Sequence, residues 1–510
     1  MFMNNSTKII ENGFVVTGDK QYRAGIFTLL TQNGRIIEIG KRADALRATY
    51  PNAEVVDASG KIILPGFVDA HYSGESFLLR YLTSGQPMSR WNKSSMINRA
   101  IHYVRKEATY QELLAMYRLS YYSALKSGVT TLAEYGIDTP EHSFAASYEA
   151  MHQTNLRGFI GLHNGDQIEA ARMLHGSSTR FAFVIADEEN LTLYNLQSSI
   201  HSARGLQWPI ILHLGQTRYA WNIVKKNFNK SIAQLYAEYR AIDPPVQLLH
   251  LSCFDDGDFE IIAKAGVPLV YSPSAILQKG TDIPPFGELL KRKIMLAIGT
   301  DWGAAKPLEN IQSYCSLLRT LGLPIERAYD LLALHTKNSA TALGLDSEIG
   351  TIETGKKADL VFLNLSEFRM NAVLSHENAE RILEVVLQEA ASQQVSEVMI
   401  DGEFYVREGH ILTYSEEDLT KDGQAMLKKL LSFHEQKTLH QPPSASILQF
   451  SVQQKSESQS SPDDISVDEG FKVVRKGQTV SSPQKKDPGS HGTPQELPKN
   501  VKKIFGDDET

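Results

Sequence analysis

The sequence has 510 residues, of which 42 % are hydrophobic, and a formal net charge of −7. This composition is typical of a globular protein with two or three domains, and the acidic balance provides no basic surface for DNA or RNA. No stretch approaches the roughly 18 apolar residues that cross a bilayer, the N-terminus MFMNNSTKII lacks the features of a signal peptide, and Cys253 and Cys315 are too few for a disulfide framework. We therefore expect a cytoplasmic protein without a nucleic-acid or membrane partner.

Residues 1–63 are rich in short β-type runs that are separated by turn residues. Asn12-Gly13 and Asn33-Gly34 each lie between alternating apolar residues, which is the strongest short signal for a β-hairpin. A second β-rich segment follows much later, at residues 346–414, where Asp401-Gly402 supplies another hairpin signal. The two segments predict small β structures on either side of the central part of the chain.

Residues 64–345 alternate between apolar runs and helical patterns. The first run, from Ile62 to His71, predicts one buried strand that ends at His71. Seven more strand-like runs follow, at 128–135, 156–165, 180–187, 208–217, 246–252, 267–274 and 294–301. Strands that alternate with helices in this way are typical of an α/β fold with a parallel sheet, and eight of them predict a TIM barrel. Polar residues at the C-terminal ends of the strands are then the candidates for an active site.

The C-terminal part of the chain has a different character. Residues 415–439 have the pattern of a polar helix, and residues 440–510 shift to Ser, Gln, Lys, Pro and Asp with few aromatic residues. A segment of that composition buries too little apolar surface to fold, so we predict a disordered tail. Its last apolar piece, VKKIF, is a candidate docking motif for a protein partner, although a chance apolar pair is the simpler interpretation.

The motif PGFVDAH at residues 65–71 resembles the first barrel strand of the amidohydrolase superfamily, in the branch of cytosine and guanine deaminases and triazine chlorohydrolases. Further blocks in the same order extend the resemblance over about residues 8–412. The resemblance implies a (β/α)₈ barrel with a small composite β-sandwich, to which residues 1–63 and 346–414 both contribute. Many relatives form dimers or larger assemblies, so a homodimer is also implied.

The resemblance implies a metal site with fewer ligands than usual. The family's first strand ends in His-x-His, two ligands of one metal ion, whereas here it ends in His71-Tyr72-Ser73. The family pattern His-x-x-Glu appears as His213-Leu214-Gly215-Gln216, so His213 matches a metal ligand and Gln216 occupies the catalytic position of the proton shuttle. The block GTDWGAAKP matches Gly-Thr-Asp, which places Asp301 as metal ligand and catalytic base. His71, His213 and Asp301 are thus the expected ligands of one divalent ion, zinc or iron.

Four other residues complete the candidate site. His250, in the sixth block, matches the catalytic histidine that polarises the substrate, and Tyr271 replaces the histidine of the seventh block. His163 lies at the end of the third strand, and Trp302 directly follows Asp301. We expect Tyr271, His163 and Trp302 to bind the substrate.

The leading interpretation is a metal-dependent hydrolase that acts on carbon–nitrogen bonds other than peptide bonds in a small cytosolic compound, such as a cyclic amidine or another deaminase-type substrate. Gln216 argues against deamination, because a glutamine side chain cannot carry a proton from water to a leaving amine. Glu75 and Glu134, near the ends of the first two strands, are candidates to replace it. The alternative is an inactive barrel that serves as a binding or scaffold protein, and metal content separates the two interpretations.

Overall fold

The computed structural model describes residues 6–40, 42–137, 142–174, 179–185, 187–243, 245–365 and 378–433. All of them belong to one structural unit, which spans Met1–Lys437. The predicted tail at 440–510, its VKKIF motif and the end of the predicted helix at 415–439 lie outside the described residues. Within the described ranges, no helix is long and apolar enough to cross a membrane.

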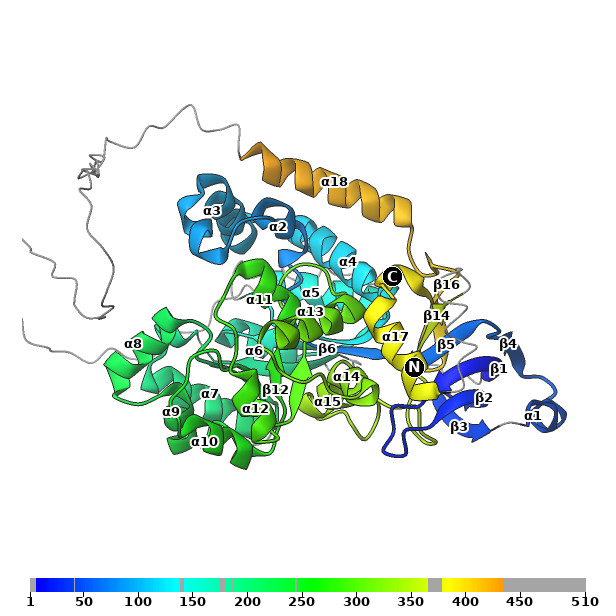
Figure 1. Cartoon of the computed structure of the whole chain (residues 1–510). Helices are drawn as coiled ribbons and strands as arrows, with labels where there is room; N and C mark the ends of the chain where they lie inside the picture. Colours follow the sequence, from blue (N-terminus) through cyan, green and yellow to red (C-terminus); the bar gives the residue numbers. More distant parts are fainter. Residues whose placement is uncertain are drawn as a thin grey trace, which may run out of the picture. The chain divides into compact units, whose positions relative to one another are not determined.

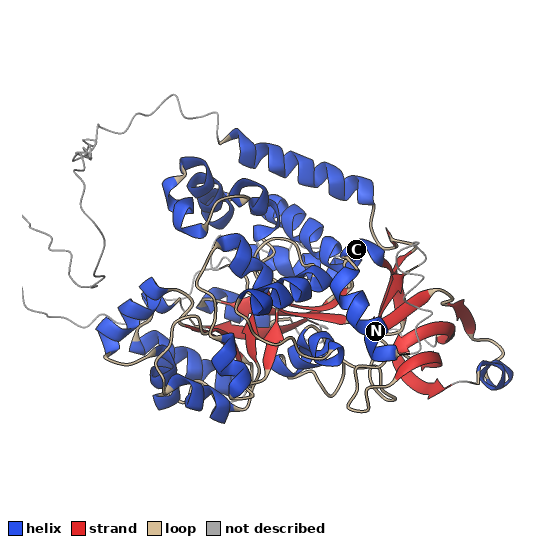
Figure 2. Cartoon of the chain, in the orientation of Figure 1, coloured by secondary structure: helices blue, strands red, loops and turns tan. Residues whose placement is uncertain are grey.

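Eight parallel strands form a barrel, and helices surround them (Figure 1, Figure 2). Each strand pairs with its neighbours in sequence order, which confirms the predicted TIM barrel. The strands are β6 (Phe67–Tyr72), β7 (Val129–Glu134), β8 (Arg157–Leu162), β9 (Thr179–Val184), β10 (Ile210–Leu214), β11 (Val246–His250), β12 (Leu269–Tyr271) and β13 (Leu296–Ile298).

Helices connect the strands and cover the outside of the barrel. They are α2 (Ser76–Thr83), α3 (Ser95–His102), α4 (Tyr110–Lys126), α5 (Ser143–Thr154), α6 (Gly165–Arg172), α7 (Leu193–Leu206), α8 (Arg218–Phe228), α9 (Ile232–Glu238), α10 (Asp258–Ala265), α11 (Pro273–Lys279), α12 (Phe286–Lys291), α13 (Pro307–Thr320), α14 (Ala328–Leu334) and α15 (Lys337–Ala342). Helix α18 (Glu416–Ser432) comes after the last strands of the chain and packs against α4.

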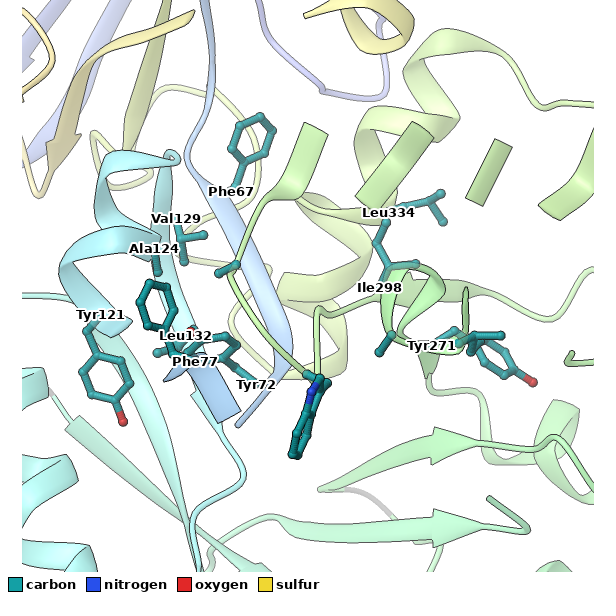
Figure 3. Packing of buried hydrophobic residues seen from close by; sticks show 14 of the residues in the cluster. Phe67, Tyr72, Phe77, Tyr121, Ala124, Val129, Leu132, Tyr271, Ile298 and Leu334 are labelled. Atoms are coloured by element: carbon teal, nitrogen blue, oxygen red, sulfur yellow. The ribbon is translucent and has the colours of Figure 1, made fainter. Parts of the chain in front are cut away.

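The main hydrophobic core lies between the barrel strands and these helices (Figure 3). Tyr121 and Ala124 of α4 face the side of the barrel that carries Phe67 of β6 together with Val129 and Leu132 of β7. All five side chains are fully buried. Because such a core is close-packed, the strand ends keep fixed positions and can hold functional side chains in a defined geometry.

The barrel closes between β6 and the backbone that follows β13. Tyr72 and Asp301 form a parallel bridge, in which the Asp301 N–H donates to the His71 carbonyl at 2.7 Å and the Ser73 N–H donates to the Asp301 carbonyl at 3.0 Å. Gly299 makes this approach possible, because a Cβ atom there would lie 2.4 Å from the His71 nitrogen. Closure therefore brings the end of the first barrel strand directly against Asp301.

A nine-stranded mixed sheet forms the second domain and combines both ends of the described chain. Strand β5 of the first segment pairs antiparallel with β14 of the second, so the two predicted segments do make one composite β domain. Its strands are β1 (Thr7–Val16), β2 (Ala24–Gln32), β3 (Arg35–Gly40), β4 (Glu54–Asp57), β5 (Lys61–Pro65), β14 (Leu360–Asn364), β15 (Val395–Ile400), β16 (Glu403–Arg407) and β17 (His410–Ile411). Two helices accompany the sheet strands in the sequence, α1 (Ala43–Thr49) and α17 (Ala379–Glu389).

The predicted single strand from Ile62 to His71 is wrong, because this run forms β5 in one sheet and β6 in the other. The two strands meet at Gly66, whose N–H donates to the Asp359 carbonyl at 2.8 Å. A Cβ atom at Gly66 would lie 2.3 Å from the Thr130 hydroxyl oxygen, so the crossing point needs a glycine. The chain thus passes from the β domain into the barrel within one residue.

The hairpin predicted at Asn12-Gly13 is also wrong. Strand β1 continues through this position with a register shift between Ile10 and Gly13, and Asn12 has φ = 63°. Here a left-handed residue produces a bulge in a continuous strand rather than a turn. The other two signals are correct, since Asn33-Gly34 joins β2 to β3 and Asp401-Gly402 joins β15 to β16.

A buried arginine ties the barrel to the β domain. Arg157, at the start of β8, forms ion pairs with Asp359 and Asp401, the latter at 2.7 Å. Arg157 and Asp359 are only 4 % and 5 % exposed. Burial opposes the charge on Arg157, but the two carboxylates outweigh it and raise the pKa of the guanidinium above its usual value.

We expect Asp359→Ala to lower the free energy of unfolding by about 3–5 kcal/mol, because it leaves the buried Arg157 charge without its main partner. Urea unfolding followed by circular dichroism measures the loss. The matched control is Glu348→Ala, which removes the partner of the half-exposed Arg180 and should cost less than about 1 kcal/mol. Equal losses in both variants would contradict this role for Arg157.

Candidate active site

Three histidines meet at the C-terminal ends of three barrel strands. His71 belongs to β6, His213 to β10 and His250 to β11, and one ring nitrogen of each lies within 4.8 Å of the others. The ring centroids are 5.0 Å apart for His213 and His250 and 5.5 Å apart for His71 and His250. Strands far apart in the sequence thus bring their imidazoles to one point, which is where TIM barrels carry their active sites.

Burial keeps these imidazoles neutral. It lowers the pKa of His71 to about 4, and it also lowers the pKa values of His213 and His250 below the usual range. Nε2 of His213 and Nε2 of His250 are buried and have no hydrogen-bond partner among the described residues. Buried polar atoms without partners are costly and rare. The three neutral imidazoles therefore present lone pairs that fit one divalent ion such as zinc.

Backbone strain accompanies the cluster. His250, Leu251 and Asp301 have φ values of 77°, 80° and 54°, a region that residues other than glycine seldom adopt. Each such residue costs on the order of 1–3 kcal/mol, and strain of this kind is concentrated at functional sites. The side chains at the ends of β11 and β13 are thus held in place at a cost in backbone strain.

Lys279, which no sequence motif indicated, lies beside the histidines. Nζ of Lys279, the last residue of α11, is 2.6 Å from Asp301 Oδ2, and both residues are buried. Burial would raise the pKa of Asp301, but the Lys279 ammonium outweighs it and holds that pKa below its usual range. The same ammonium contributes to the lowered pKa values of His71, His213 and His250.

The predicted ligand set of His71, His213 and Asp301 shares two members with this histidine cluster. His71 and His213 are in the cluster as expected, but the third nitrogen comes from His250. Asp301 is near, with Oδ1 at 3.6 Å from His71 Nε2, yet its other oxygen is held by Lys279. Sequence comparison with the family could not show this, because Lys279 lies beyond the end of the seventh motif block.

A cavity of about 670 Å³ opens beside the histidine cluster. Its lining combines aromatic, titratable and small polar side chains: His71, Ser73, Trp91, Tyr135, His163, Asp187, Glu188, His213, Gln216, Lys279, Asp301 and Trp302 are among them. The volume is in the range of sites that bind small molecules. Most of the predicted site residues thus share one cavity, and His250 belongs to the histidine cluster without being among the described lining residues.

The three predicted substrate contacts have different positions. Trp302 lines the cavity, packs against Trp91 in a tilted arrangement with the ring centroids 4.7 Å apart, and donates its indole N–H to the Thr83 hydroxyl at 3.2 Å. His163 also lines the cavity, with Nε2 at 2.9 Å from the Tyr135 carbonyl oxygen. Both are placed to contact a ligand.

Tyr271, in contrast, lies in the core and not among the described residues that line the cavity (Figure 3). Its ring packs on Phe286 at 5.3 Å, and its hydroxyl donates to the Leu251 carbonyl at 3.3 Å. The structure therefore gives Tyr271 a packing role. A tyrosine at the family's histidine position fills apolar space behind the site instead of reaching a ligand.

The two predicted substitutes for the missing glutamate are engaged in structural contacts. Glu134 accepts hydrogen bonds from the N–H groups of Gly74 and Gly136 and from the Tyr121 hydroxyl. Glu75 pairs with Arg105 at 3.4 Å. Both carboxyls are buried, and neither is among the described residues lining the cavity.

Glu188 is a site residue that sequence reasoning missed. It begins the short helix η3 (Glu188–Asn190) after β9, it is 3 % exposed, and it lines the cavity. One of its oxygens accepts a hydrogen bond from the N–H of Gly215, which directly precedes Gln216. Its place just past a barrel strand was the available signal, because strand ends in this fold face the site.

The sequence of residues 62–405, more than half of the chain, matches the family described as Amidohydrolase family. The chain belongs to the amidohydrolase family. This confirms the resemblance on which the site was predicted. It is consistent with the eight-stranded barrel and with the histidines at the strand ends.

Several proteins are similar to this amidohydrolase-family chain. The 5-methylthioadenosine/S-adenosylhomocysteine deaminase of Pyrococcus furiosus is 25 % identical over 437 residues, which cover 81 % of this chain and 98 % of that protein. A zinc-bound adenosine deaminase from Xanthomonas campestris has a TM-score of 0.75 at 20 % identity and covers 84 % of this chain and 99 % of its own. Atrazine chlorohydrolase from Arthrobacter aurescens TC1, complexed with zinc, has a TM-score of 0.69 at 17 % identity over 82 % of this chain and 100 % of its own. The two structures share the fold.

We expect Lys279→Met to strengthen zinc binding by a factor on the order of ten or more. The substitution removes a positive charge beside the imidazoles, and a charge at this range in a partly buried site is worth more than about 1 kcal/mol. Titration against a competing chelator measures the affinity. Lys291→Met, at the exposed end of α12, is the control, and an affinity in Lys279→Met no higher than the parent's would contradict the expectation.

Proposed function

We propose that this chain is a metal-dependent hydrolase that cleaves carbon–nitrogen bonds other than peptide bonds in a small compound. The observation that carries the proposal is the cluster of three neutral imidazoles at the strand ends, in which Nε2 of His213 and Nε2 of His250 have no partner among the described residues. His71, His213 and His250 would hold one divalent ion, zinc or iron. Such an ion, when bound, makes water acidic enough to serve as a nucleophile near neutral pH.

The cavity supports a flat, heterocyclic substrate that carries an amino group. Tyr135, Trp91 and Trp302 supply aromatic surface, and Tyr135 stacks on His213 at 5.0 Å with an interplanar angle of 9°. Aromatic side chains contact planar rings favourably. Two of the three proteins named above are an adenosine deaminase and a 5-methylthioadenosine/S-adenosylhomocysteine deaminase, so an aminopurine or a related cyclic amidine is the substrate class that we propose.

A second candidate function is an inactive barrel that binds a ligand without converting it. Two observations favour it: Gln216 cannot move protons, and Lys279 pairs with the Asp301 carboxylate. Such a protein would still bind a heterocycle in the cavity, but it would not need the ion. Metal content and ammonia release therefore separate the two functions.

The proposal predicts that the purified full chain retains zinc or iron and releases ammonia from at least one of 5-methylthioadenosine, adenosine and guanine. His213→Ala should abolish both metal retention and ammonia release, because it removes one of three ligands. Elemental analysis and an enzyme-coupled ammonia assay provide the readouts. His152→Ala, at an exposed position of α5, should change neither. A parent chain that binds its substrate without metal and without turnover would support the inactive barrel instead.

A further inference from the structure

The proposed hydrolysis needs a group that moves protons, and Gln216 cannot be that group. An amide side chain neither accepts a proton from water nor gives one to a leaving amine at neutral pH. Glu134 is held by Tyr121 and two glycine N–H groups and Glu75 by Arg105, and neither glutamate is among the described residues that line the cavity. The carrier must therefore be another titratable side chain that faces the cavity.

We propose that the carboxyl group of Glu188 carries protons between the attacking water and the substrate nitrogens; this inference rests on the hydrolase function proposed above. Glu188 lines the same cavity as His213 and Gln216, and it is 3 % exposed. Its Oε1 is anchored by the Gly215 N–H, whereas its Oε2 is buried and has no partner within the described part of the chain. One oxygen thus positions the group, and the other is available for a proton.

The backbone around Gly215 fixes this anchor next to a proposed metal ligand. Gly215 follows His213 by two residues and has φ = 62°, and a Cβ atom there would lie 2.1 Å from the Cys253 carbonyl oxygen. The Cys253 N–H donates to the Gly215 carbonyl at 2.9 Å. A side chain at position 215 would break this contact. The backbone at Gly215 is therefore held in place, and its N–H stays directed at Glu188 Oε1.

The surroundings of Glu188 suit a proton carrier. Burial raises the pKa of Glu188 to about 7, although the N–H groups of Gly215 and Gln216 act in the opposite direction. The charged or titratable groups around it include Asp187 and Glu189 on its own segment, Tyr236 of α9 and Cys253 after β11, and helix α8, which begins with Arg218, also packs against η3. A carboxyl group with a pKa near the working pH both accepts and releases protons readily.

The step balances in two transfers. Water attacks the carbon that carries the amino group, a carbon–oxygen bond forms, and the electron pair of the carbon–nitrogen double bond moves to the ring nitrogen. The Glu188 carboxylate takes one proton from the water and gives it to the ring nitrogen. It then takes the second proton from the new hydroxyl and gives it to the amino nitrogen, so that the carbon–nitrogen bond breaks. Ammonia leaves, a carbonyl remains, and Glu188 is again a carboxylate.

The test compares Glu188→Gln with the parent in the zinc-loaded full chain, with 5-methylthioadenosine, adenosine and guanine as probes. We expect kcat to fall by about 100-fold or more, with zinc content and melting temperature unchanged. Glu326→Gln is the matched control, since Glu326 also has a raised pKa and an unpartnered oxygen among the described residues but lies outside this cavity. Its kcat should stay within about twofold of the parent.

Two further measurements separate catalysis from structure. Adding Gln216→Glu to Glu188→Gln should recover about tenfold in kcat, because it returns a carboxyl group to the cavity near the proposed metal ligand His213. If Glu188 had only a structural role, this second substitution would not restore kcat. Infrared difference spectra of the parent should show a carboxyl band that titrates near pH 7 and is absent in Glu188→Gln.

The outcomes are distinct. An active parent with unchanged kcat in Glu188→Gln, or a Glu188 carboxyl that stays ionised from about pH 5 to 9, overturns the proton-carrier role and leaves the hydrolase function standing. A parent that turns over none of the probes overturns the proposed function and the role of Glu188 together. Loss of kcat without loss of zinc, joined by rescue through position 216, supports both.

Discussion

Hydrogen bonds between the C-terminal end of β6 and the backbone after β13 close the barrel, and the geometry of the site depends on them. The Asp69 carboxylate strengthens this seam by accepting hydrogen bonds from the N–H and the hydroxyl of Thr300, the former at 3.0 Å. Burial raises the pKa of Asp69 to about 7, while the Thr300 hydrogen bonds act in the opposite direction. Because Gly299 allows the two backbones to approach closely, His71 and Asp301 are held next to each other where the barrel closes.

Burial in the rigid barrel also determines which side chains at its C-terminal end carry a charge. Water is largely excluded, so the three imidazoles stay neutral and their nitrogens remain available. A buried carboxylate in this position needs a cation, and Lys279 supplies one to Asp301 at 2.6 Å. A divalent ion in the cluster would therefore share its surroundings with a resident ammonium. The affinity of the histidine cluster for a metal ion would therefore depend on the Lys279–Asp301 ion pair.

Positions 216 and 188 show how a carboxyl group can enter one cavity from different elements of a fold. The glutamate that the family pattern places after β10 is a glutamine here, but the N–H before it holds a carboxyl group that comes from the end of β9. The ends of neighbouring parallel strands lie at the same edge of the barrel, so a side chain can be replaced by one from the next strand. Glutamine in place of the family's glutamate at position 216 therefore does not leave the cavity without a carboxyl group, because Glu188 supplies one.

The sequence by itself determined the barrel strands and the strand ends near His71, His213, His250 and Asp301, because apolar periodicity and strand-end motifs are local properties of the chain, whereas the composite β domain followed from the family resemblance. Only the tertiary structure decided the rest. It separated β5 from β6 at Gly66, placed Tyr271 in the core, paired Lys279 with Asp301 and brought Glu188 beside Gln216. Such contacts join residues that are distant in the sequence, and they are selected by packing and by the need to pair buried charge, which no local pattern records.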